Sequence, residues 1–106
     1  MDTCILIYTT CKNKEEAKSI GKNLVQEKIV ACVNILDRME SIYVWNSELV
    51  EDSETILISK TVESNFKYAE QRIKQLHSYT NPCIVSISIQ EGSQEYLQWI
   101  HDSVDH

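Results

Sequence analysis

Apolar and polar positions follow patterns along this chain that predict four strands and three helices. Residues 4–9 are apolar on both faces, which is typical of a central strand. Asn13, with Glu16 three residues later, resembles a capping box, and apolar residues then recur at helical spacing as far as Lys28. The later patterns predict, in order, a strand from Ala31 towards Trp45, a strand over 55–61, a helix from Ser64 or Asn65 to His77, a strand over 84–89 and a short helix from Gly92 to Ile100.

The second and third predicted strands along the chain, joined by a polar connector over residues 46–54, form a hairpin that is apolar on both faces. Alternation places Ile42 and Val44 on one face and Tyr43 and Trp45 on the other. A core beneath the sheet buries only one of these pairs. The sequence therefore predicts a partner chain that covers the other pair.

The length of this hairpin supports the same prediction. A strand from Ala31 to Trp45 is roughly 45 Å long at about 3.3 Å per residue. A compact domain of this size has a radius of gyration of roughly 13 Å. We expect the hairpin to bend at residues 37–40, to protrude, or both, and a second subunit to cover its edges.

The order of elements predicts an α+β fold of the ferredoxin-like type, βαββαβ with an extra C-terminal helix, in one domain over residues 1–106. Right-handed crossovers place the start of the first helix, the end of the second and the start of the last strand at one end of the sheet. We therefore expect Cys11, His77 and Cys83 to converge there. Two thiols and an imidazole suit copper or another soft cation such as Zn(II), so the three residues are a candidate metal site. The alternative is that the thiols are small buried residues and that His77 bonds carbonyls at the helix end.

Composition narrows the function classes. The formal net charge is -6 and the ten basic residues are scattered, which disfavours a nucleic-acid partner. The first residues lack the pattern of a secretion signal, no apolar run is long enough to span a membrane, and the four cysteines form no Cys-x-x-Cys pair. We expect a cytoplasmic protein with reduced thiols. With two glycines, no phosphate-binding loop and no nucleophile elbow, we expect no enzyme.

Four motifs in order resemble the CutA divalent-cation tolerance family. They are Ala31-Cys32-Val33-Asn34-Ile35, the stretch from Ser41 to Trp45 with Glu48, Glu51 and Glu54 beyond it, Leu57-Ile58-Ser59-Lys60-Thr61, and Tyr96-Leu97-Gln98-Trp99-Ile100. The resemblance implies a homotrimer whose long hairpins pair across subunits, with Tyr43, Trp45 and Trp99 as interface residues. It also implies a role in tolerance to divalent metal ions, with copper as a candidate ligand. Kinship to trimeric P-II signalling proteins leaves an alternative, a sensor or scaffold that binds a small ligand or a partner protein at subunit clefts.

The chain departs from the family pattern at its metal loop. The family sequence His-Pro-Tyr-Glu-x-Pro-Glu is similar to residues 77–83, where His77, Tyr79 and Pro82 match and Cys83 stands in place of the last glutamate. The family also has a cysteine ligand at the end of the first strand, where this chain has Thr9, and Cys11 lies two residues later. The resemblance thus transfers only His77 as a ligand.

Overall fold

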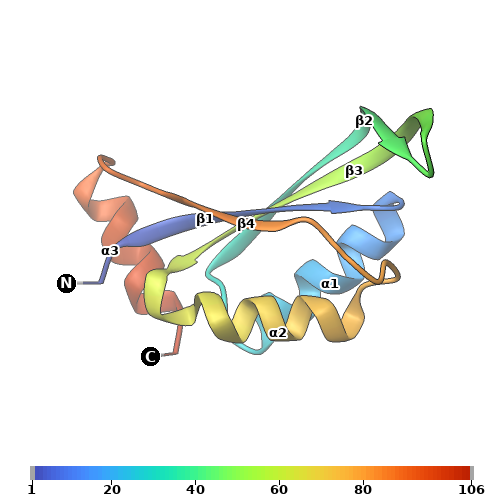
Figure 1. The fold of residues 1–106 in the computed structure, drawn as a ribbon. Coiled ribbons are helices and arrows are strands. Elements are labelled where there is room, and N and C mark those ends of the chain that lie inside the picture. The colour runs from blue at the N-terminus through green and yellow to red at the C-terminus, as the bar shows by residue number, and fades with distance from the viewer. Residues whose placement is uncertain (1, 106) are drawn as a thin grey trace.

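The structure is a computed structural model that describes residues 2–105, and it has the predicted ferredoxin-like order (Figure 1). Four antiparallel strands form one sheet in the order β2-β3-β1-β4, so the first strand is central as predicted. The elements are β1 Cys4–Cys11, α1 Lys14–Gln26, β2 Cys32–Trp45, β3 Glu48–Val62, a 3-10 turn Glu63–Asn65, α2 Phe66–Leu76, β4 Ile84–Ser88 and α3 Gln94–Ser103.

The core lies between the sheet and the two helices α1 and α2, which run along one of its faces (Figure 1). Every second residue of β1 is buried on this side, from Ile5 through Ile7 and Thr9 to Cys11. This spacing follows from the two-residue repeat of a strand. Helix α3 covers the other end of the sheet, where Ile100 packs with Val62 in a second, smaller cluster. Among the described residues, no helix is both long enough and apolar enough to cross a membrane.

The β2–β3 hairpin bends and protrudes, as predicted. A register shift between Leu36 and Met39 marks a bulge, and Arg38 has a φ of 63°. Beyond the bulge the hairpin extends past the end of β1, and the molecule measures 45 × 26 × 21 Å (Figure 1). A bulge bends the strand and increases its twist. The part of the hairpin beyond the bulge, residues 39–54, is the outer hairpin, and it lies beyond the end of the helical layer.

The predicted polar connector over residues 46–54 is wrong. The turn consists of Asn46 and Ser47, with φ of 50° and 64°, and β3 begins directly after it at Glu48. Two-residue hairpin turns of the I′ class require positive φ at both positions, which favours asparagine at the first. Residues 48–54, four of which are acidic, therefore pair with β2 instead of forming a loop.

The two helix starts differ. Asn13 caps α1 as predicted, because its Oδ1 accepts the Glu16 amide at 2.8 Å. Asn65, one of the two predicted caps, occupies the N-cap position of α2, but its side chain makes no capping hydrogen bond. The Asn65 side chain instead donates to the carbonyls of Ile29 and Asp105, at 3.1 and 2.8 Å, and so joins three separate segments.

Candidate functional site

Three potential metal ligands meet where the end of β1, the start of α1 and the loop after α2 come together. One potential ligand atom from each residue lies within 4.8 Å of the other two: the Sγ of Cys11, a carboxylate oxygen of Glu16 and a ring nitrogen of His77. These three residues form the Cys11 group. Figure 1 shows the three segments at the same end of the sheet. The predicted convergence of Cys11 and His77 is thus present in the structure, while Cys83 is exposed and is not a member of this group among residues 2–105.

His77 is held by hydrogen bonds on both ring nitrogens. Its Nε2 lies 2.8 Å from the Thr10 carbonyl, and its Nδ1 accepts the Tyr79 amide at 3.1 Å. Since the carbonyl requires a donor and the amide requires an acceptor, the ring is the neutral tautomer with its proton on Nε2. The ring therefore joins the loop to strand β1 and not to a helix end. Its Nδ1 also faces Glu16, with 3.8 Å to Oε1.

Glu16 links three segments with one carboxylate. Its Oε1 accepts the Lys12 amide at 3.0 Å, as the glutamate of a capping box does near the helix start, and its Oε2 accepts the Ser78 amide at 2.9 Å. Burial alone would raise the pKa of this carboxyl, but the hydrogen bonds from Ser78 and Lys12 outweigh burial and lower the pKa. Glu16 is therefore an ionised acceptor at neutral pH.

Cys11 is a protonated thiol in the resting structure. Its side chain has no exposed surface, and burial, followed by the negative charges of Glu16 and Glu54, raises its pKa to about 12. A thiolate is the form that attacks electrophiles and binds metals. Cys11 is thus a poor nucleophile as it stands, and a cation that binds it must displace its proton.

A second network ties the loop to the hairpin. The Tyr79 hydroxyl donates to Glu54 Oε2 at 2.8 Å, and the Ser41 hydroxyl donates to Glu54 Oε1 at 2.6 Å. The Tyr79 ring also packs on the His77 ring, with centroids 4.8 Å apart. Burial and then the Glu54 carboxylate raise the pKa of Tyr79 well above its ordinary range, which keeps its hydroxyl a donor. The loop after α2 therefore contacts both the Cys11 group, through His77, and the base of the outer hairpin, through Glu54.

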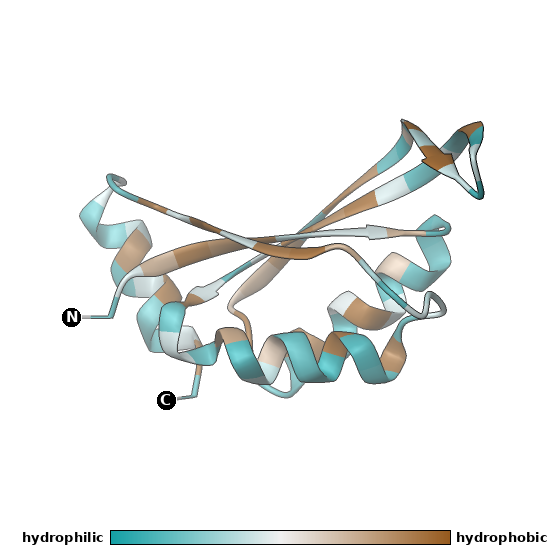
Figure 2. Ribbon diagram, viewed as in Figure 1, coloured by the Kyte–Doolittle hydropathy of each residue, from teal (hydrophilic) through white to brown (hydrophobic). Residues whose placement is uncertain are grey.

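The predicted interface residues are exposed in the single chain. Trp45 is 66% exposed, Trp99 45% and Tyr43 42%. Ile42 and Val44, on the opposite strand face, are exposed by 66% and 67%, so residues 2–105 cover neither face of the outer hairpin. Figure 2 shows hydrophobic positions on the hairpin beyond the end of the helical layer.

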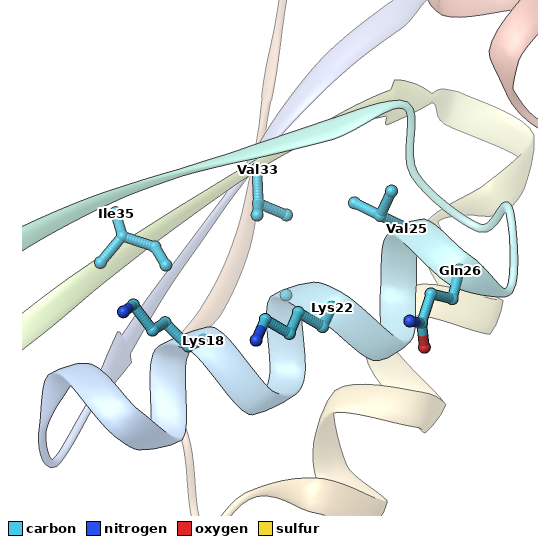
Figure 3. A pocket seen from close by; sticks show the side chains of 7 residues that line it. Lys18, Lys22, Val25, Gln26, Val33 and Ile35 are labelled. Atoms are coloured by element: carbon cyan, nitrogen blue, oxygen red, sulfur yellow. The ribbon is translucent and has the colours of Figure 1, made fainter.

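A groove runs along the outer edge of the sheet. Val33 and Ile35 of β2 point toward α1, from which Lys18 and Lys22 project beside an apolar floor (Figure 3). The cavity has a volume of about 310 Å³. It lies beside the edge strand β2 and is separate from the Cys11 group.

The comparisons with other proteins decide the family. A sequence model of the CutA1 divalent ion tolerance family matches residues 5–103. The chain belongs to the CutA family. The divalent-cation tolerance protein CutA of Thermus thermophilus is 44% identical over 103 residues, which are 97% of this chain and 98% of that protein. The crystal structure of CutA1 from Oryza sativa superposes with a TM-score of 0.96 at 35% identity, over 98% of this chain and 95% of that one.

Other CutA relatives differ in length and in the compartment that their names give. The CutA structure from Archaeoglobus fulgidus, described as periplasmic, has a TM-score of 0.93 at 37% identity and covers 96% of this chain and 99% of its own. The chloroplastic relatives from Arabidopsis thaliana and Oryza sativa are longer, and this chain spans 54% and 56% of them.

Within this CutA chain, sequence reasoning missed Glu16 and Tyr79 as parts of the site. Glu16 was assigned to the helix cap, a role that it has, and its second bond to Ser78 depends on a loop distant in sequence. Its position on the first turn of α1, beside Cys11, was the available signal. At the position of the family's cysteine ligand, Thr9 is fully buried in the core, away from solvent.

Proposed function

We propose that this CutA family member acts in tolerance to divalent metal ions as a cytoplasmic homotrimer that binds copper or another soft cation at the end of the sheet where Cys11 and His77 meet. One observation carries the cation-binding part: a thiol, an imidazole and a carboxylate lie within 4.8 Å of one another. Sulfur and imidazole ligands suit Zn(II) and copper better than Mg(II) or Ca(II). The exposed Cys83 lies on the same loop as His77 and is the other thiol of the proposed site.

The exposed hairpin supports the homotrimer. Its apolar side chains on both faces, Tyr43 and Trp45 among them, are uncovered in one chain, and β2 and β4 are edge strands. Uncovered strand edges and apolar patches of this kind are typical of surfaces that bind another chain. In the proposed trimer, Tyr43, Trp45 and Trp99 lie at subunit contacts.

We propose binding without catalysis. The Cys11 thiol is buried with its pKa raised to about 12, and His77 uses both ring nitrogens in hydrogen bonds. Nucleophilic catalysis requires an accessible thiolate and a base that is free to take its proton.

Native mass spectrometry of the reduced, tag-free protein tests both parts at once. We expect a trimer that takes up one Zn(II), or one copper kept as Cu(I) by the reductant, per subunit. A trimer that takes up no metal would refute cation binding. A monomer at micromolar concentration would refute the assembly.

The groove beside β2 favours one alternative, a P-II-like sensor or scaffold. Lys18 and Lys22 flank its apolar floor at a sheet edge, which suits a small anion with an apolar part. A thermal-shift screen of organic anions tests this function. A ligand that stabilises the wild type and fails to stabilise the Lys18→Glu, Lys22→Glu double variant would support the sensor.

A further inference from the structure

The ligand atoms of the Cys11 group are slightly farther apart than they would be around a bound metal ion. Around a tetrahedral ion with bonds of about 2.0 to 2.3 Å, neighbouring ligand atoms are roughly 3.3 to 3.8 Å apart. His77 Nδ1 and Glu16 Oε1 are already 3.8 Å apart, and Cys11 Sγ lies within 4.8 Å of one ring nitrogen of His77 and one carboxylate oxygen of Glu16. A contraction of about 1 Å would therefore complete a three-ligand set.

Hydrogen bonds within the chain now occupy two of these ligand atoms. Nδ1 of His77 accepts the Tyr79 amide, and Oε1 of Glu16 accepts the Lys12 amide. A metal ion on Nδ1 needs the lone pair that the Tyr79 amide uses, so the loop that follows His77 must move before the ion binds. The other ring nitrogen, Nε2, donates to the Thr10 carbonyl and keeps the ring oriented, as the second nitrogen of a metal-bound histidine commonly does.

We propose that Cys11 Sγ, Glu16 Oε1 and His77 Nδ1 form the cation site, and that it fills when residues 78–83 shift and release Nδ1. The inference rests on the proposed cation binding and replaces Cys83 with Glu16 as the third ligand. The cation takes the place of the Cys11 proton, which passes to solvent, and the Glu16 carboxylate offsets part of its charge.

Tyr79 is the positioning residue that holds the site closed. Its amide occupies His77 Nδ1, while its hydroxyl, bound to Glu54, anchors the loop to the hairpin. Loss of the hydroxyl bond should make the shift of the loop less costly and metal binding correspondingly tighter. Phenylalanine at this position keeps the ring that packs on His77.

Titration of the reduced protein with Co(II) tests the ligand set, because thiolate ligands give a charge-transfer absorption band that other ligands do not. We expect the band in the wild type, its loss in Cys11→Ser and its retention in Cys83→Ser, and the comparison of the two variants separates this ligand set from one that contains Cys83. Glu16→Gln keeps the shape and one acceptor oxygen, and should weaken binding by roughly ten-fold or more. If Cys11→Ser does not fold, as judged by circular dichroism, the Glu16→Gln affinity decides.

The outcomes separate this site from cation binding in general. A band that survives Cys11→Ser and disappears in Cys83→Ser, or an unchanged affinity in Glu16→Gln, would overturn the ligand set and leave cation binding in place. A wild type that binds neither Co(II) nor Zn(II) would overturn both.

The same titration tests the role of Tyr79. Tyr79→Phe should tighten Co(II) binding by roughly five-fold, the factor equivalent to one hydrogen bond. Amide hydrogen exchange in residues 78–83 should also become faster in this variant. Tyr68→Phe, on the exposed side of α2, is the control and should change neither measurement. An affinity that is unchanged or weaker in Tyr79→Phe would overturn the closing role.

Discussion

The outer hairpin and the Cys11 group are opposites in composition and in burial. The hairpin places apolar side chains in solvent, with Trp45 66% exposed, whereas the Cys11 group places polar side chains in the interior, with Cys11 fully buried. Exposed apolar surface is unfavourable until something covers it, so the hairpin points to a partner. Buried polar groups are costly unless they are hydrogen-bonded, and Glu16 and His77 are hydrogen-bonded within the chain. The apolar side chains of the first region are uncovered in the single chain, whereas the polar side chains of the second are hydrogen-bonded within it.

The largest expected effect tests the hairpin side of this contrast. Trp45→Ala should weaken subunit association by on the order of 2 kcal/mol or more, because a large aromatic at an interface centre is among its strongest contributors. The secondary structure of the chain should persist, since Trp45 belongs to neither core cluster of residues 2–105. Analytical ultracentrifugation over a range of concentrations measures the change. Tyr68→Ala, another exposed aromatic, is the control, and equal dissociation in both variants would contradict a specific role for the hairpin.

A smaller effect is expected where the polar group is stabilised within the chain. Glu16→Ala removes the acceptor of the Lys12 and Ser78 amides and should lower the free energy of unfolding by about 2 kcal/mol. Glu15→Ala changes an exposed carboxylate in the same helical turn and should cost much less. Denaturant unfolding of the two variants makes the comparison. Similar losses of unfolding free energy in the two variants would mean that the hydrogen bonds of Glu16 stabilise the fold no more than an exposed carboxylate does.

The two regions also differ in how far the sequence predicted them. The bend and the two-sided hairpin follow from a strand's two-residue repeat and its length, which are local properties. The turn at Asn46 and Ser47 was missed because the acidic residues beyond it look like a loop, although they pair with β2. At the Cys11 group, topology predicted which ends of the helices and strands meet, but not the directions in which their side chains point.

Cys83 illustrates that limit. It immediately precedes β4, as predicted, yet its side chain is exposed, and Glu16, which sequence reasoning assigned to the cap, lies within the ligand group instead. A loop conformation depends on bonds such as that of Tyr79 to Glu54, which join residues 25 positions apart. No periodic pattern in the sequence encodes such a bond.

Two buried hydroxyls are exceptions to the rule that buried polar groups are hydrogen-bonded. Among the described residues, Thr9 Oγ1 and Ser59 Oγ are buried with no hydrogen-bond partner. Ser59→Ala should therefore stabilise the protein by about 1 kcal/mol, because it removes an unsatisfied group and leaves only a small void. Thr61→Val is the contrast, since the Thr61 hydroxyl donates to the Ile29 carbonyl at 2.6 Å and its loss should destabilise. Thermal unfolding distinguishes the two signs, and a destabilised Ser59→Ala would show that this hydroxyl has a partner in solution.

The smallest expected effect concerns the joint between the two regions. At the bulge, Asp37 Oδ1 accepts the Thr55 hydroxyl and the Arg38 amide, each at 2.8 Å. These two bonds, the Thr55 bond first, hold the pKa of the Asp37 carboxyl below its ordinary value.

A carboxyl with a lowered folded-state pKa stabilises the fold above its unfolded-state pKa, and this stabilisation is lost as the pH falls through the folded-state value. Wild type should therefore lose stability below about pH 4, where Asp37→Asn should show a shallower dependence. Thermal unfolding of both proteins between pH 2 and pH 7, with Asp52→Asn on the exposed outer hairpin as the control, measures this difference. Parallel pH profiles for wild type and Asp37→Asn would mean that the bulge keeps its shape without the ionised carboxylate.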